Sequence, residues 1–457
     1  MKKIDILDNI IKKECKNGKD YQDFFTFLYK NHENYDYFVD ASIFDKNKYE
    51  NYKEELKNKM EMNNLTKIEK SCIGSILGMS IGDAMGARVE FLPLDYSYNK
   101  VKNMGKNKAG KFDLEPGQWT DDTSMGLCLA DSLIEKDGEF DPKDIMMRFI
   151  LWWSHGYNNA FRFDKKRKNK HSVGLGGNIS GSLKEYIKTK GKNSYTKYGN
   201  KNTSGNGSIM RNAAIPICYF RNMDKALKYS RKQSLITHQG KEAAGCCQLL
   251  TFIIVKIFLL KIKELDKDNQ IQKNQLDNTN NSDQIISRSL KDDILNNLDE
   301  FNCKYCESVN ILAQSKQEGK DKNKNWNWKD KNFKYNEKRA KSNPCYIGSY
   351  CMDALAMALH VLYTTDSFEK ALLKVVNLCG DADSIGSIVG QIAGAYYGLD
   401  NIPKDWIEKI NKWDNNEIAL RGYILLCLSK DIKIQSNKND EMSEESEEEN
   451  DTNCNIF

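Results

Sequence analysis

Residues 74–86, GSILGMSIGDAMG, carry a glycine at every fourth position. Residues 386–398, GSIVGQIAGAYYG, repeat the same spacing. Four-residue spacing lines the glycines along one ridge of an α-helix, where each costs roughly 1 kcal/mol relative to alanine. Eight glycines in register therefore need a compensating gain, which the close approach of another helix supplies. We interpret these two glycine ladders as packing surfaces of closely packed helices.

Outward from the ladders, apolar residues at helical spacing extend through about 66–260 and 345–428. No stretch shows the sustained two-residue alternation of a half-buried strand. The sequence therefore predicts an all-α, compact multi-helix domain over residues 66–430. The longest apolar run, 249–260, contains Lys256 and is shorter than the ~20 residues of a membrane span. We expect it to form a buried core helix and expect no contact with a membrane.

Three polar segments lie outside this pattern. We expect residues 1–65 to form a helical extension. We expect residues 261–344 to form a polar, low-complexity and largely mobile insertion, and residues 431–457 to form a disordered acidic tail. The tail holds eight acidic residues between 440 and 451, so the formal charge of +5 becomes about +13 for the remainder of the chain.

The end of the insertion mixes cations with aromatic rings. Nine Lys and Arg residues and three acidic residues lie between 320 and 341, together with Trp326, Trp328, Phe333 and Tyr335. Such a mixture suits weak contact with a polyanion through phosphates and stacked bases. A solvated loop has the same composition, and both interpretations stay open here.

The cysteines and the N-terminus bear on the compartment. Thirteen cysteines are odd in number and irregularly spaced, which does not suggest a disulfide framework. Asp5 and Asp8 interrupt the only apolar stretch near the N-terminus, so no secretory leader is predicted. We expect a cytoplasmic, reducing location and a monomer.

Acidic residues cluster near predicted helix ends. Asp83 lies within the first ladder, with Glu90 just after it; Asp381 and Asp383 precede the second; Asp121 and Asp122 lie in GQWTDDTSMGLCLADSLIE, residues 117–135, after Thr120 as a plausible N-cap. One acidic pair at a helix start has an ordinary explanation, because the helix dipole favours carboxylate there. Two matched pairs that lead into apolar helices predict a shared site. Four converging carboxylates would repel one another unless a cation neutralised them, and oxygen ligands favour Mg²⁺ or Mn²⁺.

Two small-residue loops could accommodate a phosphate. They are SGNGSIMRNAAIPI, residues 204–217, and GLGGNISGSL, residues 174–183. Backbone N–H groups in such loops can approach an anion closely, although each loop alone is a weak signal. Ser234 and His238 lie four residues apart on one predicted helical face, where a histidine is more often structural than functional.

Together, and in this order, these segments resemble the ADP-ribosylglycohydrolase family, which includes the dinitrogenase reductase-activating glycohydrolase and the ADP-ribosylarginine and ADP-ribosylserine hydrolases. The resemblance covers about residues 68–260 and 345–410 and rests on WTDDTSM, GNGSIMR, the Ser-x-x-Thr-His segment and GDADSIG. It implies an all-helical domain that hydrolyses the bond between ADP-ribose and a modified acceptor, either a protein or another ADP-ribose conjugate. It also implies two divalent cations as cofactors, Mg²⁺ first and Mn²⁺ as the alternative.

The resemblance assigns roles position by position. Glu90 matches the family's catalytic glutamate. The implied metal ligands are Thr120, Asp121, Asp122, Asp381, Asp383 and Ser384. Serine replaces the usual threonine at 384, and its hydroxyl can ligate similarly. The implied substrate-binding residues are Gly176, Gly177, Asn178, Gly205, Asn206, Gly207, Ser208, Met210, Arg211, Ser234 and His238.

One departure and two competing functions remain. Many family members, including the bacterial arginine-specific type, carry Asp-Ile-Gly where this chain has Gly174, Leu175 and Gly176. An aspartate thought to orient the scissile group is therefore missing, which puts arginine specificity in doubt. The alternatives are a non-catalytic ADP-ribose-binding or structural protein and a two-metal phosphatase. The phosphatase would require neither the glycine loop nor the histidine segment.

Overall fold

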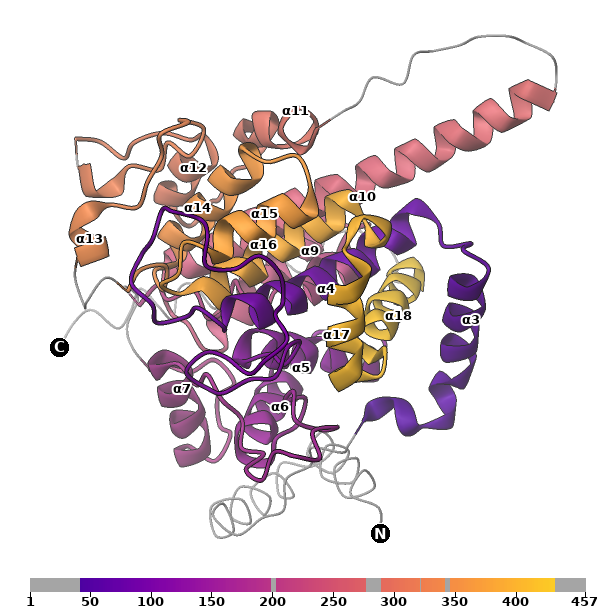
Figure 1. Ribbon diagram of the computed structural model, residues 1–457, viewed down its shortest axis with the longest axis horizontal. Helices are drawn as coiled ribbons and strands as arrows, with labels where there is room; N and C mark the ends of the chain where they lie inside the picture. The colour runs from indigo at the N-terminus through magenta and orange to yellow at the C-terminus, as the bar shows by residue number, and fades with distance from the viewer. Residues whose placement is uncertain (1–41, 199–202, 277–288, 321, 342–345, 432–457) are drawn as a thin grey trace.

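The computed structural model describes residues 42–198, 203–276, 289–320, 322–341 and 346–431. Within these ranges the chain forms sixteen α-helices, α3 to α18, five short 3₁₀ helices and no strands, only isolated bridges (Figure 1). The predicted all-α fold is confirmed. The predictions for residues 1–41 of the extension and 432–457 of the tail lie outside the described residues.

The helices of the first half are α3 (Glu50–Glu61), α4 (Lys67–Gly86), α5 (Asp121–Glu135), α6 (Pro142–His155), α7 (Gly177–Lys188), α8 (Ala214–Tyr219), α9 (Met223–Leu235) and α10 (Lys241–Leu276). Those of the second half are α11 (Leu290–Asp293), α12 (Glu307–Ala313), α13 (Glu337–Lys341), α14 (Cys351–Tyr363), α15 (Phe368–Val376), α16 (Ala382–Tyr397), α17 (Lys404–Asp414) and α18 (Glu417–Asp431). The 3₁₀ helices are η1 (Ile43–Asp45), η2 (Asn47–Tyr49), η3 (Leu295–Glu300), η4 (Lys322–Lys324) and η5 (Leu399–Asn401).

The two glycine ladders face each other on α4 and α16 at the centre of the molecule (Figure 1). A Cβ on Gly78 would lie 2.1 Å from the carbonyl oxygen of Gly390, and one on Gly82 would lie 2.0 Å from that of Gly386. Because real Cβ atoms never approach backbone oxygens so closely, only glycine permits this contact. The pairing is antiparallel, so the end of α4 lies beside the start of α16.

Five further helices pack against this pair. They are α5, α10, α14, α15 and α18, and their apolar side chains form one continuous core with α4 and α16. The helix predicted over 249–260 is part of α10 and is buried as expected. Its stretch Lys241–Asp266 is long and apolar enough to cross a membrane by length and composition alone, but 83% of the most apolar window is buried inside the protein.

The described part of the N-terminal extension packs against the domain. Lys46 and Tyr49 both bond to the carboxylate of Glu135 at the end of α5, and Leu56 of α3 is buried. Residues 42–65 are thus attached to the helix whose other end carries Asp121 and Asp122.

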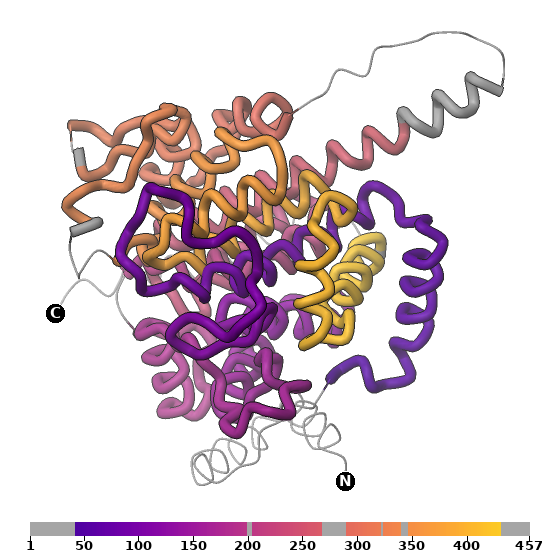
Figure 2. The backbone as a smooth tube through the Cα atoms, in the orientation of Figure 1, coloured from indigo at the N-terminus to yellow at the C-terminus, as the bar shows by residue number. Residues whose placement is uncertain are grey.

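The insertion differs from the prediction, which was a largely mobile segment. Residues 289–320 and 322–341 form helices and fold back onto α14, as the chain trace shows (Figure 2). Trp326 and Trp328 are only 1% and 0% exposed, and the Trp328 indole donates to the carbonyl of Leu312 at 2.7 Å. The expectation of mobility is therefore wrong for these residues, and neither indole is available to stack on a base. The Trp328 ring contacts Tyr363 at the end of α14, and the Trp326 ring contacts Tyr350, the residue before α14.

Candidate active site

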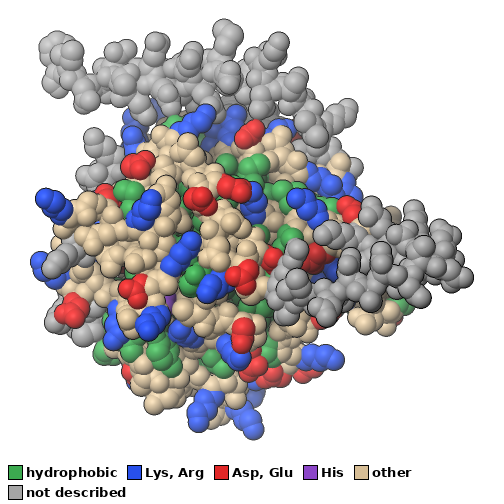
Figure 3. Space-filling view, turned by 90° about the horizontal axis from the view of Figure 1, so that it is seen from above, with side chains coloured by type: hydrophobic (Ala, Val, Ile, Leu, Met, Phe, Trp, Pro, Cys, Tyr) green, Lys and Arg blue, Asp and Glu red, His purple; other side chains and the backbone are tan. Residues whose placement is uncertain are grey.

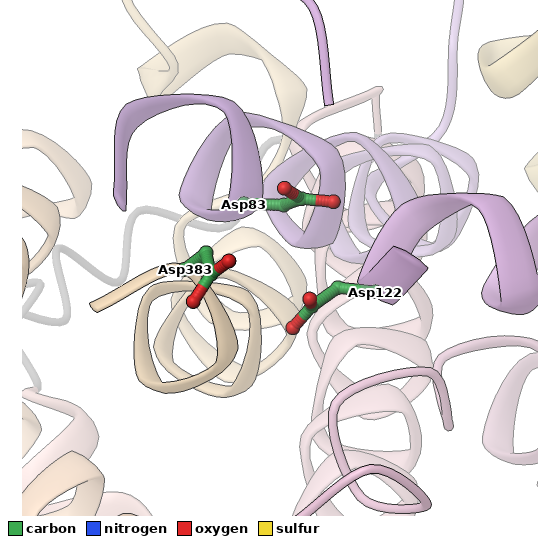
Figure 4. A group of neighbouring side chains, drawn as sticks. All are labelled: Asp83, Asp122 and Asp383. Carbon is green, nitrogen blue, oxygen red and sulfur yellow. The ribbon is translucent and has the colours of Figure 1, made fainter. Parts of the chain in front are cut away.

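The acidic residues predicted to converge do so where three helix ends meet. Carboxylate oxygens of Asp83, Asp122 and Asp383 lie within 4.8 Å of one another, at the end of α4 and the starts of α5 and α16 (Figure 4). Oxygens of Glu90, Asp381 and Asp383 form a second group within the same limit. Asp383 belongs to both groups, so the two together outline one acidic centre.

Asp83 organises the start of α5. Its carboxylate accepts from the backbone N–H of Thr120 at 2.9 and 3.1 Å and from that of Thr123 at 2.9 Å. The hydroxyl of Thr120 also donates to Asp83 at 2.9 Å. Thr120 occupies the predicted N-cap position, but its side chain does not cap the helix. The cap is instead provided by an aspartate from α4, which satisfies N–H groups that a helix start leaves free.

Asp381 is held by two loops. Its backbone N–H donates to the carbonyl of Ile347 at 2.8 Å, and its carboxylate accepts from the Asn206 amide at 3.0 Å. Asn206 donates also to the carbonyl of Gly348 at 3.0 Å, and its backbone N–H to that of Ser349 at 2.9 Å. The predicted phosphate loop is therefore bonded directly to the predicted metal ligand.

Glu90 lies in the turn that follows α4. This turn is fixed because Phe91 donates to the carbonyl of Gly380 at 3.0 Å and Gly380 donates to that of Leu92 at 2.9 Å. Burial and the neighbouring charge of Asp381 raise the pKa of Glu90 to about 8. The hydroxyl of Tyr346 lies 3.5 Å from the Glu90 carboxylate. Glu90 thus contributes a carboxylate to the acidic centre beside Asp381 and Asp383.

The electrostatics of the centre match a cation site. Burial and mutual repulsion raise the pKa values of Asp121, Asp122 and Asp383 well above the ordinary value. Two buried carboxylate oxygens, Asp122 Oδ1 and Glu90 Oε2, have no hydrogen-bond partner among the described residues. Unpartnered carboxylate oxygens at this depth are costly unless a cation or proton compensates them. The donor set is all oxygen, which suits Mg²⁺ or Mn²⁺.

The remaining predicted metal ligands lie at the same helix starts. Asp121 is buried but belongs to neither three-carboxylate group, and its Oδ1 lies where a Cβ on Gly174 would be placed, 2.0 Å away. The hydroxyl of Ser384 points to the sulfur of Met210 at 3.6 Å. Both lie beside the acidic centre, and their role as metal ligands stays a prediction.

The predicted substrate loops surround His238. A Cβ on Gly205 or Gly207 would lie 3.5 or 3.0 Å from the His238 ring. Thr237 Oγ1 bonds to His238 Nδ1 at 2.8 Å, and the Asn178 amide donates to the carbonyl of Thr237 at 2.8 Å. Burial and the charge of Arg211 lower the pKa of His238 to about 3, so the ring is neutral.

Within the glycine loop, Ser208 and Arg211 face the protein interior. The Ser208 and Ser234 hydroxyls bond to each other at 2.8 Å. Arg211 is fully buried and donates to Gln233 at 3.1 Å and to Thr237 at 2.8 Å. This guanidinium holds the loop against α9. Gly176 and Gly177 at the start of α7, in contrast, are exposed, and nothing lies within 4 Å of a Cβ built on either.

Sequence reasoning did not assign roles to two residues of the centre. The sequence places Asp83 within the first ladder, but we did not assign it to the site. Its position directly after Gly82 was the one feature that could have suggested such a role. Tyr346 lies outside every motif that we used. Its ring stacks on Phe91 at a centroid distance of 5.4 Å, a contact that no local pattern predicts.

The site combines a central helix pair, a buried carboxylate cluster and an adjoining glycine loop in an all-helical fold. Residues 64–435 match the family model described as ADP-ribosylglycohydrolase. The chain therefore belongs to the ADP-ribosylglycohydrolase family.

Three curated relatives act on ADP-ribosyl groups by name. The ADP-ribosylarginine hydrolase Tri1 of Serratia proteamaculans is 30% identical over 339 residues, 74% of each chain. The ADP-ribosyl-[dinitrogen reductase] glycohydrolase of Rhodospirillum rubrum is 25% identical, covering 79% of this chain and 97% of the relative. The ADP-ribosylhydrolase ARH3 of Danio rerio is 27% identical, covering 82% and 94%.

A solved structure titled "ADP-ribosylglycohydrolase-related protein complex" superimposes with a TM-score of 0.56 at 26% identity. It covers 80% of this chain and 100% of its own. These relatives indicate ADP-ribosyl hydrolase activity.

Proposed function

We propose that this protein is a metal-dependent hydrolase that releases ADP-ribose from a modified acceptor, with two divalent cations at the acidic centre. The supporting observation is that two buried carboxylate oxygens, Asp122 Oδ1 and Glu90 Oε2, have no hydrogen-bond partner in the described part of the chain and lie inside a cluster of carboxylates with raised pKa values. A purely structural role would be better served by paired groups, because isolated buried charges destabilise a fold.

Asp122, Asp381 and Asp383 are the proposed principal cation ligands, with Thr120, Asp121 and Ser384 completing the set. When bound, Mg²⁺ or Mn²⁺ supplies Lewis-acid polarisation and a template for the sugar hydroxyls. Asp83 acts indirectly: it holds the Thr120 and Thr123 backbone and so fixes the direction in which Asp122 points.

The chain's own groups provide the binding and the proton. The loop through Gly205 and Gly207 offers a closely approachable backbone for the diphosphate. His238 is neutral, and its Nδ1 is engaged by Thr237, which leaves Nε2 as the atom facing that loop. Cleavage at the anomeric carbon develops positive charge on the sugar, which nearby carboxylates stabilise. Glu90 Oε2, which has no partner among the described residues, is the proposed atom that gives or takes the proton.

The conformation of Gly174 bears on whether the modified acceptor is arginine. Its φ of +90° is a conformation that L side chains rarely adopt, and Asp121 occupies the space of a Cβ. An aspartate at this position could not be accommodated without moving Asp121. We therefore extend hydrolysis to this chain from its relatives, but not arginine specificity.

The test is incubation of the purified full chain with arginine-linked, serine-linked, nucleic-acid-linked and polymeric ADP-ribose, and with O-acetyl-ADP-ribose, with Mg²⁺, Mn²⁺ or chelator. We expect free ADP-ribose from at least one substrate, only with metal. No release from any substrate would overturn the hydrolase proposal. Release at an equal rate in chelator would overturn the metal requirement.

Glu90→Gln separates catalysis from metal binding. The variant should lose at least about 100-fold in rate, as expected for removing a general acid or base. Its thermal stabilisation by Mg²⁺ should remain at least in part, because the proposed aspartate ligands are unchanged although Glu90 belongs to the second carboxylate group. A variant as active as the parent would exclude Glu90 from proton transfer.

A further inference from the structure

Two basic loop segments border the acidic centre on the outside. Residues 99–113, between α4 and α5, and residues 162–171, between α6 and α7, together hold eleven Lys and Arg and two Asp. We call these two segments the basic rim. They lie against each other, because Arg167 donates to the backbone carbonyls of Phe112 and Asp113 at 3.3 Å. Both loops lie on the front of the molecule in Figure 1.

The rim is attached directly to the site. Lys111 Nζ lies 4.1 Å from the ring centroid of Phe91, the residue that follows Glu90. On the other segment, Asp164 accepts from the Gln118 amide at 2.8 Å, two residues before Thr120. The rim therefore adjoins the turn that carries Glu90 and the segment that leads into α5.

Five of the eleven cations of the rim have no acidic partner among the described residues. The side chains of Lys102, Lys106, Lys165, Lys166 and Lys168 are exposed and form no ion pair within the described ranges. Of the two acids, Asp164 is 4% exposed and is occupied by backbone N–H groups of the same loop. The face drawn in Figure 3, by contrast, mixes red and blue side chains. An unpaired array of one sign attracts polyanions.

Exposed aromatic rings accompany these cations. Among the described residues four aromatic side chains are classed as exposed, and three of them, Phe91, Tyr98 and Phe163, lie on or beside the rim at 41%, 39% and 38% exposure. Phe91 already stacks on Tyr346 and contacts Lys111, so a base would stack on Tyr98 or Phe163 rather than on Phe91. Exposed rings beside cations are the pattern of single-strand binding, because phosphates contact the cations while unpaired bases stack on the rings. An acidic peptide would use the cations and leave the rings unexplained.

We propose that the basic rim binds single-stranded nucleic acid and that the acceptors of this protein include a nucleic-acid strand carrying ADP-ribose. The substrate half of this inference rests on the proposed hydrolase function; the binding half does not. The strand would lie along the rim, with its modified nucleotide at Glu90. This surface replaces the one expected in the insertion, whose indoles are buried.

The binding half is tested with a fluorescent, unmodified single-stranded RNA of about 20 nucleotides, titrated with the full-length protein from 50 to 200 mM salt. The variant is Lys165→Gln, Lys166→Gln and Lys168→Gln together. In single-strand binding, each phosphate contact contributes about 0.7 to the steepness with which log affinity falls against log salt concentration. The triple variant removes three such contacts. The slope should therefore fall by about two, and across this fourfold salt range the parent should lose about 16-fold more affinity than the variant.

The matched control removes three exposed lysines outside the rim, Lys304→Gln, Lys316→Gln and Lys404→Gln, and should bind like the parent. Phe163→Ala should weaken binding by about tenfold through lost stacking. Equal slopes for parent and rim variant would overturn the inference. So would equal weakening by the control, or binding of ADP-ribose polymer but not RNA.

Release of ADP-ribose from a small modified peptide separates the two proposals. If the parent hydrolyses the peptide but binds no RNA, only the rim inference fails. If it binds RNA through the rim but hydrolyses no ADP-ribosyl substrate, the proposed function fails and the nucleic-acid surface remains.

Discussion

Replacing Asp383 by asparagine should make the metal-free protein more stable and remove its response to Mg²⁺. Asp383 is the only carboxylate shared by the two acidic groups found in the described residues. Two full charges 4.8 Å apart repel by about 3.5 kcal/mol at an effective dielectric constant of ~20. Raised pKa values mean that protonation already relieves part of this repulsion. We therefore expect the substitution to add about 1–2 kcal/mol of stability in chelator.

Bound metal should make the parent gain more stability than the variant. A ligand at 100 times its dissociation constant stabilises the folded state by about 2.7 kcal/mol. At ~2.1 cal/mol/K of unfolding entropy per residue, a chain of 457 residues shifts by roughly 1 °C per kcal/mol, so the midpoint of thermal unfolding of the parent should rise by about 3 °C with saturating Mg²⁺. Asp383→Asn should start higher in chelator and move by less than about 1 °C, because it lacks the ligand that both groups share.

The assay is thermal unfolding of parent and variant in chelator and over a Mg²⁺ titration at constant ionic strength. Asp366→Asn is the matched control, since its carboxylate is 70% exposed and paired only with Lys370; it should behave like the parent. The reasoning is refuted if Asp383→Asn is less stable than the parent in chelator, or if Mg²⁺ stabilises both by the same amount.

Three further outcomes follow from the packing. The Cβ of Gly390→Ala would lie 1.9 Å from a carbonyl oxygen of α4, so this variant should lower the free energy of unfolding by ~1–3 kcal/mol in denaturant titration. Gly177→Ala is the control: it has open space around it and should change the free energy of unfolding by less than about 0.5 kcal/mol. Asp131→Asn should cost about 3–5 kcal/mol at pH 7, because it leaves Arg421 buried without its 2.7 Å partner. Burial raises the pKa of Asp131, but Arg421 lowers it further, so the net shift is downward; the stability of this pair is present above the ordinary carboxyl pKa and is lost only as the pH falls below about 4, where parent and variant should converge. Arg339→Gln removes two 2.6 Å bonds from the insertion to α14 and should speed proteolysis within 322–341 without preventing folding of the domain.

The parts of the fold that sequence predicts are those with a local periodic signal. The four-residue glycine spacing predicts close helix packing because a missing side chain is useful only against a near neighbour. It does not reveal that α4 and α16 are each other's partner across 300 residues. The matched acidic pairs suggest convergence, and the ladder pairing provides its physical cause: Gly86 at the end of α4 meets Ala382 at the start of α16.

Composition misled us where packing is non-local. The insertion is rich in lysine and asparagine, which predicts mobility, yet Trp326 and Trp328 are buried and Arg339 bonds to Asp353 of α14. A few buried side chains at irregular spacing can hold a polar segment on a preformed surface. The average composition of the segment does not reveal such side chains. The N-cap of α5 was missed for the same reason, since Asp83 lies 37 residues before Thr120.

The position of the acidic centre follows from the ladders. Backbone-to-backbone contact leaves no flexible side chains between α4 and α16, so the two helices have little freedom to slide or separate. Asp83 and Asp383 extend from the meeting ends of these helices, and Asp83 then binds the first N–H groups of α5, which presents Asp122. Three carboxylates that repel one another are thereby held together by glycine contacts and a capping bond, neither of which involves the repelling oxygens of Asp122 or Asp383. The energy that keeps the charges close comes from the packing of the fold, and a cation can then bind a site whose geometry is already set.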